Sequence, residues 1–360
     1  MPEDGVQGIR VAAGRGGEVG DAGLTGGNVS GDAQRGGYPQ APGCGQVQHP
    51  FEVYHRLGAL RLLRWPPGGP FGTNRVSRLR AEAWRKGTPA VTVVVRRPGP
   101  PLAGLVTEMV YRTGEQARTS VEKILPGPET GLWVNLNRDA FRSFGAAGQV
   151  RQVPGAMVSG PAGRASVIEF EEGHAHVSVA FALGAAPCFL APSLGVLRDE
   201  LVPLEEVCGG AGAFLRERLL EAASPGDALA VMEDFLIGQM ADDAGPDPAV
   251  VAAAGALARG SRVAEVADRL GLLPRTLRRR FTAQVGLTPK RFGRVQRLQR
   301  LVQGLDGQAR VDWAAAAARH GYCDQAHLAD EFRELVGVTP AGYLRSRVNG
   351  PNHLRFDVRS

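Results

Sequence analysis

Residues able to contact nucleic acid cluster in the last third of the chain. The stretch PRTLRRRF carries five polar side chains, Arg275, Thr276, Arg278, Arg279 and Arg280. Guanidinium groups donate paired hydrogen bonds to phosphate oxygens and to the O6 and N7 edge of guanine. If this stretch is a helix with Leu277 and Phe281 on its buried face, the first three arginines and the tip of Arg280 project outward. The pattern therefore indicates a helix surface suited to DNA.

A second basic stripe follows in PKRFGRVQRLQRLVQGL, where Arg291, Arg294 and Arg297 are spaced three residues apart. The apolar residues of this stretch fall on another face: Phe292, Val295, Leu298, Val302 and Leu305. About sixteen residues in a helix span roughly 24 Å. We expect an amphipathic helix with a basic outer stripe.

The basic stretch belongs to a unit that occurs twice. GLLPRTLRRRFTAQVGLTP ends at Pro289, and GYCDQAHLADEFRELVGVTP ends at Pro340. Phe281 aligns with Phe332 and Gly286 with Gly337, both at an offset of fifty-one residues. The second copy offers Gln325 and His327 as neutral groups for base edges or phosphates, and Arg333 as a cation.

Each unit is predicted to be two helices joined by a short turn. In the first copy, SRVAEVADRLG reads as a helix capped by Ser261 and ended by Gly271, and Pro274 opens the next helix. Small Ala267 lets the two helices cross closely, which is the geometry of a helix-turn-helix.

The doubled unit, its unequal internal length, the two Thr-Pro ends and the linking helix resemble the DNA-binding domain of the AraC/XylS family of bacterial transcription regulators. The resemblance covers residues 259 to about 347. It implies that the second helix of each copy faces DNA and that the linking helix holds both copies on one side of the duplex. Major-groove faces recur about every 34 Å, so two such helices read a longer site. Two residues depart from the family pattern: Asp330 replaces a polar or basic residue, and Leu273 replaces a Ser or Thr cap.

The expected DNA contacts are the residues named above: Arg275, Thr276, Arg278, Arg279, Arg280, Arg291, Arg294, Arg297, Gln325, His327 and Arg333. Residues 259–347 hold 17 basic and 8 acidic side chains, although the whole chain has a net charge of only +6. We expect the first copy to dominate phosphate attraction and its salt dependence. An alternative remains for the arginines alone, because only Lys86, Lys123 and Lys290 are lysines and codon bias could enrich arginine.

The N-terminal part divides into four predicted segments. Residues 1–50 are a Gly-rich tail without periodicity, expected to be disordered, and residues 51–95 are a poorly defined extension. Residues 96–205 hold short apolar runs such as GLWVNL and SVIEF, which predict an antiparallel, barrel-like β domain with a small cavity. In HAHVSVAFAL the alternation predicts a strand with one buried face. Residues 206–258 form a helical connector, with Ser224 and Asp247 as helix caps and a candidate dimer contact.

The predicted fold is therefore α+β, with an N-terminal antiparallel β-barrel-like sensor domain and a C-terminal all-α domain, residues 259–348, with two helix-turn-helix motifs. Residues 349–360 form a tail. RPGPPLAGLVTEMVYR and VSGPAGRASVIEF faintly resemble the sensor region of some AraC-type regulators. That resemblance implies a small-molecule effector bound by the β domain. RNA polymerase and a second copy of the chain are further candidate partners. No apolar run is long enough to span a membrane and no secretory signal is evident, so we expect a cytoplasmic protein.

Metal and catalytic chemistry have weak support in the sequence. His174 and His176 point the same way along a strand, but no further ligand follows at a suitable spacing, so we expect solvent-facing histidines. The four cysteines lack CxxC spacing, and no metal or cofactor is expected. We expect Trp133, Phe141, Phe144, Phe170 and Phe181 to be core residues, although a ligand pocket needs such walls.

The leading hypothesis is a sequence-specific transcription regulator, not an enzyme. The alternatives are a cupin-like metal-dependent enzyme domain fused to a DNA-binding module, and an architectural DNA binder. The sequence does not identify the effector, the operator, the sign of regulation or the oligomeric state.

Overall fold

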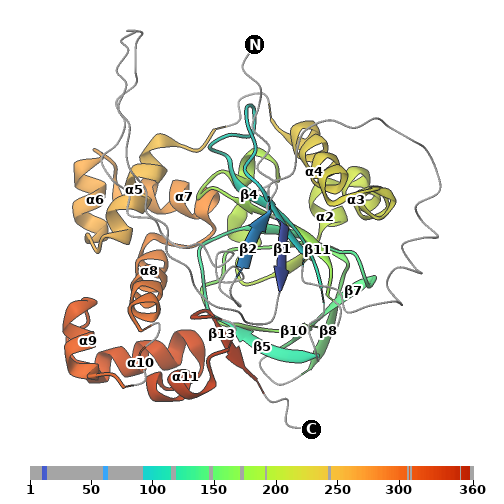
Figure 1. The fold of residues 1–360 in the computed structure, drawn as a ribbon. Helices are drawn as coiled ribbons and strands as arrows, with labels where there is room; N and C mark the ends of the chain where they lie inside the picture. The colour runs from blue at the N-terminus through green and yellow to red at the C-terminus, as the bar shows by residue number, and fades with distance from the viewer. Residues whose placement is uncertain are drawn as a thin grey trace, which may run out of the picture.

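The computed structural model describes residues 10–13, 60–63 and 92–356, except 115–118, 146–148, 171–173, 191–192, 242–244, 306–307, 309 and 349. Strands occupy the first half of this range and helices the second, so the predicted α+β class is confirmed (Figure 1). Of the predicted tail and extension, the structure describes β1 (Arg10–Ala13), which pairs with β2 (Leu60–Leu63), and the start of β3. The rest of those two predictions lies outside the described residues.

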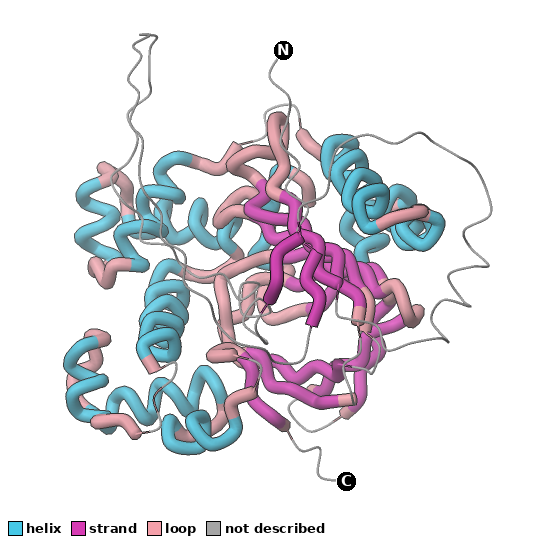
Figure 2. The backbone as a smooth tube through the Cα atoms, viewed as in Figure 1, coloured by secondary structure: helices cyan, strands magenta, loops and turns pink. Residues whose placement is uncertain are grey.

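The β domain consists of two antiparallel sheets, which curve around one another without closing into a single barrel (Figure 2). The six-stranded sheet has the order β12-β9-β6-β11-β4-β3. Its strands are β3 (Thr92–Arg96), β4 (Val106–Thr113), β6 (Gly131–Asn135), β9 (Ala156–Ser159), β11 (His176–Phe181) and β12 (Leu201–Pro203). All six residues of β11 are buried, so the prediction of a single buried face was wrong. β11 lies between β4 and β6, and both faces of this central strand are covered.

The five-stranded sheet has the order β13-β5-β10-β7-β8. Its strands are β5 (Ser120–Ile124), β7 (Ala140–Phe144), β8 (Val150–Pro154), β10 (Ser166–Phe170) and β13 (His353–Arg355). β13 lies within the predicted C-terminal tail, and it pairs with β5 at residues more than two hundred positions earlier. The chain therefore returns from the helical region to complete the edge of the β domain.

Short helices connect and cover the sheets. They are η2 (Ala186–Cys188), η3 (Leu194–Val196), α2 (Leu204–Cys208), α3 (Gly210–Glu221) and α4 (Pro225–Gln239). Leu215, Leu229 and Phe235 share one apolar core with Val177 and Val179 of β11. The Ser224 hydroxyl accepts a hydrogen bond from the Asp227 amide, as its predicted capping role requires.

The remaining helices build the two copies of the repeated unit. They are α5 (Pro248–Ala258), α6 (Val263–Arg269), α7 (Pro274–Val285), α8 (Pro289–Gly304), α9 (Trp313–Arg319), α10 (Gln325–Val336) and α11 (Pro340–Ser346). The repeated glycines Gly286 and Gly337 end α7 and α10 in the left-handed conformation, each at φ 79°. The Thr of each Thr-Pro pair caps the helix that follows.

The predicted inner faces of these helices are confirmed. Leu277, Phe281 and Val285 are buried with Ala267 in one core, to which α5 also contributes. A separate core contains Phe332 and Leu335 of the second copy. Two residues of the β domain, Leu125 and Leu354, belong to that second core.

One predicted cap was wrong. Arg262, not Ser261, is the N-cap of α6, and the Glu265 carboxylate accepts a hydrogen bond from the Arg262 amide. Ser261 lies one residue too early because α6 begins at Val263. Leu273 gives α7 no side-chain cap, as its residue type predicts.

Candidate nucleic-acid interface

The second helix of the first copy, α7, presents a basic surface. Arg275, Arg278 and Arg279 are exposed, and none of them has an ion-pair partner within the described part of the chain. Thr276 lies beside them and is half-buried. Since Leu277 and Phe281 anchor the opposite face, these guanidinium groups point away from the core. They are free to donate to phosphates or to guanine edges.

The tip of Arg280, which was predicted to project outward, is bound to the acid that caps α5. Its Nε donates to Asp247 Oδ2 at 2.6 Å, and the same carboxylate forms an ion pair with the guanidinium. Asp247 is the N-cap of α5, which packs against α7 in the core of the first copy. The Arg280 side chain therefore ties α7 to α5 instead of reaching outward.

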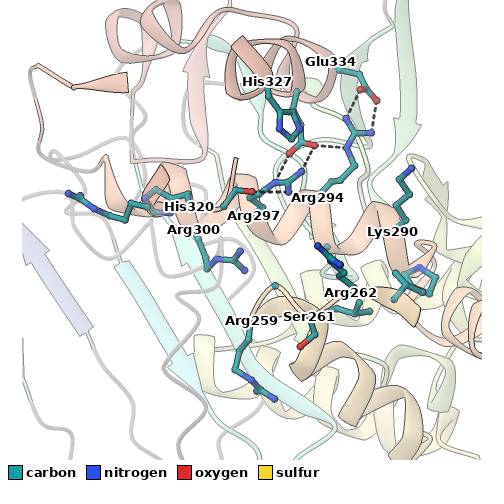
Figure 3. A pocket seen from close by; sticks show the side chains of 18 of the residues that line it. Arg259, Ser261, Arg262, Lys290, Arg294, Arg297, Arg300, His320, His327 and Glu334 are labelled. Atoms are coloured by element: carbon teal, nitrogen blue, oxygen red, sulfur yellow. Dashed lines mark hydrogen bonds and ion pairs between the residues drawn. The ribbon is translucent and has the colours of Figure 1, made fainter. Parts of the chain in front are cut away.

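A groove with a volume of about 900 Å³ separates the two copies. Lys290, Arg294 and Arg297 of α8 form its floor, as Figure 3 shows. Arg259 and Arg262 approach from the first copy, and Arg319, His320 and His327 from the second. A polyanion lying in this groove would meet cations from both copies.

The α8 arginines are paired with acids of α10, which their basic spacing does not reveal. Arg294 Nε lies 2.7 Å from Glu331 Oε2, and its terminal nitrogens donate to Glu334. Arg297 Nη2 lies 2.6 Å from Glu331 Oε2. The hydrogen bond from Arg294 lowers the pKa of the Glu334 carboxyl. The Glu331 side chain is only 4% exposed, so these pairs bind α8 to α10 across the floor of the groove.

Arg291, the first residue of the predicted stripe, is also engaged. It donates to Glu334 Oε1 at 3.1 Å and to a carbonyl of the β domain. All three arginines of the predicted basic stripe are therefore engaged in ion pairs with α10, and their contact with DNA stays a prediction. These pairs form because acids about forty residues later in the chain fold onto them.

The second copy offers fewer free cations. Gln325 is exposed at the start of α10. His327 Nδ1 accepts a hydrogen bond from the Cys323 amide at 3.2 Å, and its ring packs edge-on against Tyr322. Arg333 forms an exposed ion pair with Asp330 at 3.1 Å. Gln325 is the predicted contact of this copy whose side chain remains most available.

Three groove residues were not singled out from the sequence: Arg259, Arg262 and Arg319. Arg259 and Arg262 flank the start of α6, and Arg319 ends α9. The repeat could have drawn attention to Arg319, because this residue aligns with Arg269 of the first copy. Lys290, the exposed first-turn residue of α8, completes the basic lining.

One short segment of the β domain, residues 161–165, contacts the end of α7, α8 and α10. Pro161 packs on Gly286 at the end of α7, where an added Cβ would lie 2.3 Å from the Pro161 Cγ. The Gly163 carbonyl accepts two hydrogen bonds from Arg291 of α8. The Ala165 amide donates to the Leu335 carbonyl of α10 at 2.8 Å. This segment therefore fixes both copies and the linking helix to the β domain.

A cavity of about 130 Å³ lies between the two sheets, beside that segment. Trp133 comes from the six-stranded sheet, Phe141 and Phe170 come from the five-stranded sheet, and all three line the cavity. The cavity is also lined by Gly160, Ala162 and Ser166, which lie within or directly beside residues 161–165. His353 of β13 lines it as well. Of the five aromatic residues expected in the core, Phe181 is in the main core.

The expectation of solvent-facing histidines was wrong. His176 is 3% exposed, and its ring lies 4.8 Å from that of His174 and 5.0 Å from that of Trp133. Burial, then the charge of Arg112, lowers the pKa of His174 to about 4. Burial, His174 and Arg112 together hold the pKa of His176 well below its ordinary value. Burial and the nearby Arg112 therefore favour the neutral form of both rings at pH 7. Among the described residues, no group of three or more His, Cys, Asp or Glu side chains is placed to hold a metal ion.

Comparison with known proteins gives two domain matches. Residues 266–346 match a helix-turn-helix domain, and residues 95–203 match a domain of unknown function, DUF6597. No curated protein sequence matches the chain. No helix in the described ranges is both long and apolar enough to cross a bilayer.

Several solved structures give distant matches. ToxT from Vibrio cholerae has 11% identity, with 63% of this chain and 97% of that chain covered at a TM-score of 0.36. ToxT bound to (E)-4-(8-methylnaphthalen-1-yl)but-3-enoic acid has 9% identity, with the same coverage and TM-score. The AraC-like transcriptional activator CuxR has 13% identity, with 59% of this chain and 87% of that chain covered at a TM-score of 0.19.

The domain match and the observed geometry agree on the helical region. Two helix pairs, each ended by a left-handed glycine, are joined by α8, and the match spans both of them. The C-terminal region of this chain is therefore a helix-turn-helix domain of the AraC type.

Proposed function

We propose that this chain is a sequence-specific DNA-binding transcription regulator whose β domain responds to a small molecule. The observation that carries the proposal is the unpaired basic surface of α7, formed by Arg275, Arg278 and Arg279, beside a groove lined by cations of both copies. In a helix-turn-helix domain, the second helix is the one that enters the major groove.

The residues divide into four roles in this proposal. Arg275, Thr276, Arg278 and Arg279 read base edges or grip phosphates from α7. Lys290, Arg259, Arg262 and Arg319 attract the DNA backbone to the groove. Arg280, Arg291, Arg294 and Arg297 position the helices through their ion pairs, and Gln325, His327 and Arg333 supply the weaker contacts of the second copy.

We propose the predicted domains as functional units, with two adjustments. Residues 96–205 sense, residues 206–258 connect and residues 259–348 bind DNA, while α5 packs in the core of the first copy and β13 completes the sensor sheet. A ligand in the inter-sheet cavity lies next to residues 161–165 and β13, which contact both copies. A ligand that binds one arrangement of these contacts more tightly shifts the population toward it and changes DNA affinity.

Two further partners belong to the proposal. A second copy of the chain is supported by large apolar side chains exposed on α3 and α4, with Phe214 62% and Ile237 41% exposed. RNA polymerase contact and a cytoplasmic location follow from the role of a transcription regulator.

In vitro selection from a random duplex library with the full chain tests the proposal. We expect one enriched sequence with two half-sites about one helical turn apart. Duplexes carrying this sequence should bind at least about a thousandfold more tightly than scrambled duplexes of equal length and salt. Equal affinity for every duplex would instead identify an architectural DNA binder.

A further inference from the structure

The inter-sheet cavity has an unusual lining for its size. Two carboxylates, Glu129 and Glu169, line it together with three aromatic rings. Among the described residues that line it, none is a lysine or an arginine. An anionic ligand would therefore meet carboxylates and no lysine or arginine in this lining, whereas a cation would meet a carboxylate and aromatic faces.

The two acids are in different situations. Glu169 forms an ion pair with Arg142 at 2.7 Å, so its charge is already balanced. Glu129 has no ion-pair partner among the described residues, and its Oε2 lies over the Cα of Gly127, where an added Cβ would be 2.3 Å away. Glu129 is thus the cavity carboxylate that remains available to a ligand.

A second acceptor lies in the same cavity. His174 Nε2 is buried and has no hydrogen-bond partner, and the neutral ring can accept a hydrogen bond there when Nδ1 carries its proton. Buried polar atoms are ordinarily satisfied, so an unsatisfied acceptor that lines the same cavity as Glu129 suits a ligand that donates hydrogen bonds.

The size of the cavity limits the ligand. An apolar cavity of roughly 150 Å³ accommodates benzene, and this cavity measures about 130 Å³. Its walls include the flat faces of Trp133, Phe141 and Phe170. The space therefore suits one ring or a short branched chain with one polar group.

We infer that the cavity binds a small organic amine in its protonated form, with the ammonium group on Glu129 and the apolar body against Trp133, Phe141 and Phe170. The inference rests on the proposed function, because it gives the chemical class of the effector of the same β domain. Cation–π attraction to the aromatic faces offsets part of the cost of moving the ammonium group out of water.

The ionisation of Glu129 fits this arrangement and supplies a second readout. Desolvation raises the pKa of its carboxyl to about 7. An ammonium group beside it favours the charged form, so binding drives the carboxyl to release its proton. At pH 7 the released amount should approach about half a proton per ligand bound.

The test is calorimetric titration of the full chain with three probes of matched shape: benzylamine, toluene and benzoate. We expect benzylamine to bind at least about tenfold more tightly than toluene and benzoate not to bind. Repeating the titration at pH 7 in buffers of different ionisation enthalpy should reveal proton release with benzylamine alone. Benzoate binding as tightly as benzylamine, or no binding of benzylamine, would overturn the inference.

Variants separate the role of Glu129 from the integrity of the fold. Glu129→Gln should bind toluene as before, lose the preference for benzylamine and lose the proton release. Glu217→Gln, an exposed change on α3, is the matched control and should behave like the original chain. An unchanged preference in Glu129→Gln contradicts the assignment. If sequence-selective DNA binding holds but benzylamine fails, only the ligand class is wrong; if DNA selectivity fails, the proposed function is wrong whatever the probes do.

Discussion

Arg291 of the linking helix donates two hydrogen bonds to the carbonyl oxygen of Gly163, from Nη2 at 2.7 Å and from Nε at 3.0 Å. The same guanidinium donates to Glu334 of the second copy. One side chain thus joins the β domain, α8 and α10. This residue, which the sequence places among the expected DNA contacts, connects the β domain to the linking helix and to the second copy.

We predict that Arg291→Ala loosens the β domain from the helical region. Hydrogen bonds from a charged group contribute about 1.5–3 kcal/mol each when partly buried, so the amide of Ala165, which bonds to Leu335, should exchange hydrogen faster. Hydrogen exchange of the full chain measures this effect. Arg275→Ala, which removes an exposed and unpaired arginine, is the control and should leave exchange unchanged. Identical exchange in both variants would show that Arg291 carries no coupling.

The basic surface of α7 should determine sequence preference, and the groove should determine salt dependence. Arg279→Ala should cost about 1–3 kcal/mol on the selected duplex and relax preference at one base pair. Lys290→Ala should weaken all duplexes alike and reduce the slope of log affinity against log salt by about one. Binding to selected and scrambled duplexes over a salt series distinguishes the two effects. Reversed behaviour of the two variants would refute the assigned roles.

Glu331 should matter to stability far more than its neighbour Glu334. Glu331 is buried between Arg294 and Arg297, and removing the acid leaves the partly buried Arg297 without its carboxylate partner and Arg294 with Glu334 alone. Glu331→Ala is expected to lower the free energy of unfolding by about 3 kcal/mol. Glu334→Ala, at a side chain 53% exposed, should cost less than about 1 kcal/mol. Urea denaturation of both variants makes the comparison, and equal losses would count against a structural role for the buried pair.

Local patterns predicted most of the helical region. Pro274 located the start of α7 and Gly271 the end of the preceding helix, because proline fixes φ at a helical value and glycine permits the left-handed conformation that ends a helix. The buried faces of α7 and α8 followed from a period of 3.6 residues. These features need only near neighbours in the chain, so sequence reasoning reaches them.

Features that depend on distant segments were not predictable. Arg294 and Glu331 are thirty-seven residues apart, and an arginine stripe has the same spacing whether it faces DNA or a buried acid. β13 pairs with β5 only because α11 directs the chain back to the sheet edge. His176 alternates like a half-exposed strand residue, but a second sheet covers it. Periodicity predicts on which face of a helix or strand a residue lies, but it does not predict which other segment covers that face.

The two buried histidines and Glu129 change the free energy of unfolding with pH in opposite directions. His174 and His176 have native pKa values below that of the unfolded chain, about 6.5. Below that pH, the unfolded chain binds protons that the native histidines do not bind. The free energy of unfolding therefore decreases as the pH falls toward about 4, the native pKa of His174. Glu129 has a raised native pKa of about 7, so its contribution is present in acid and is lost as the pH rises through 7.

Acidification from pH 7.5 to 5 should therefore destabilise the chain, because two histidines oppose one carboxyl. Each proton taken up only by the unfolded chain lowers the free energy of unfolding by about 1.4 kcal/mol per pH unit. His176→Phe should flatten this dependence by removing one such proton, whereas Glu129→Gln should steepen it by removing the opposing carboxyl. Urea denaturation of the full chain at several pH values gives the three curves. Parallel curves for all three proteins would mean that these groups titrate alike in the folded and unfolded states, and that the inter-sheet space is open to water.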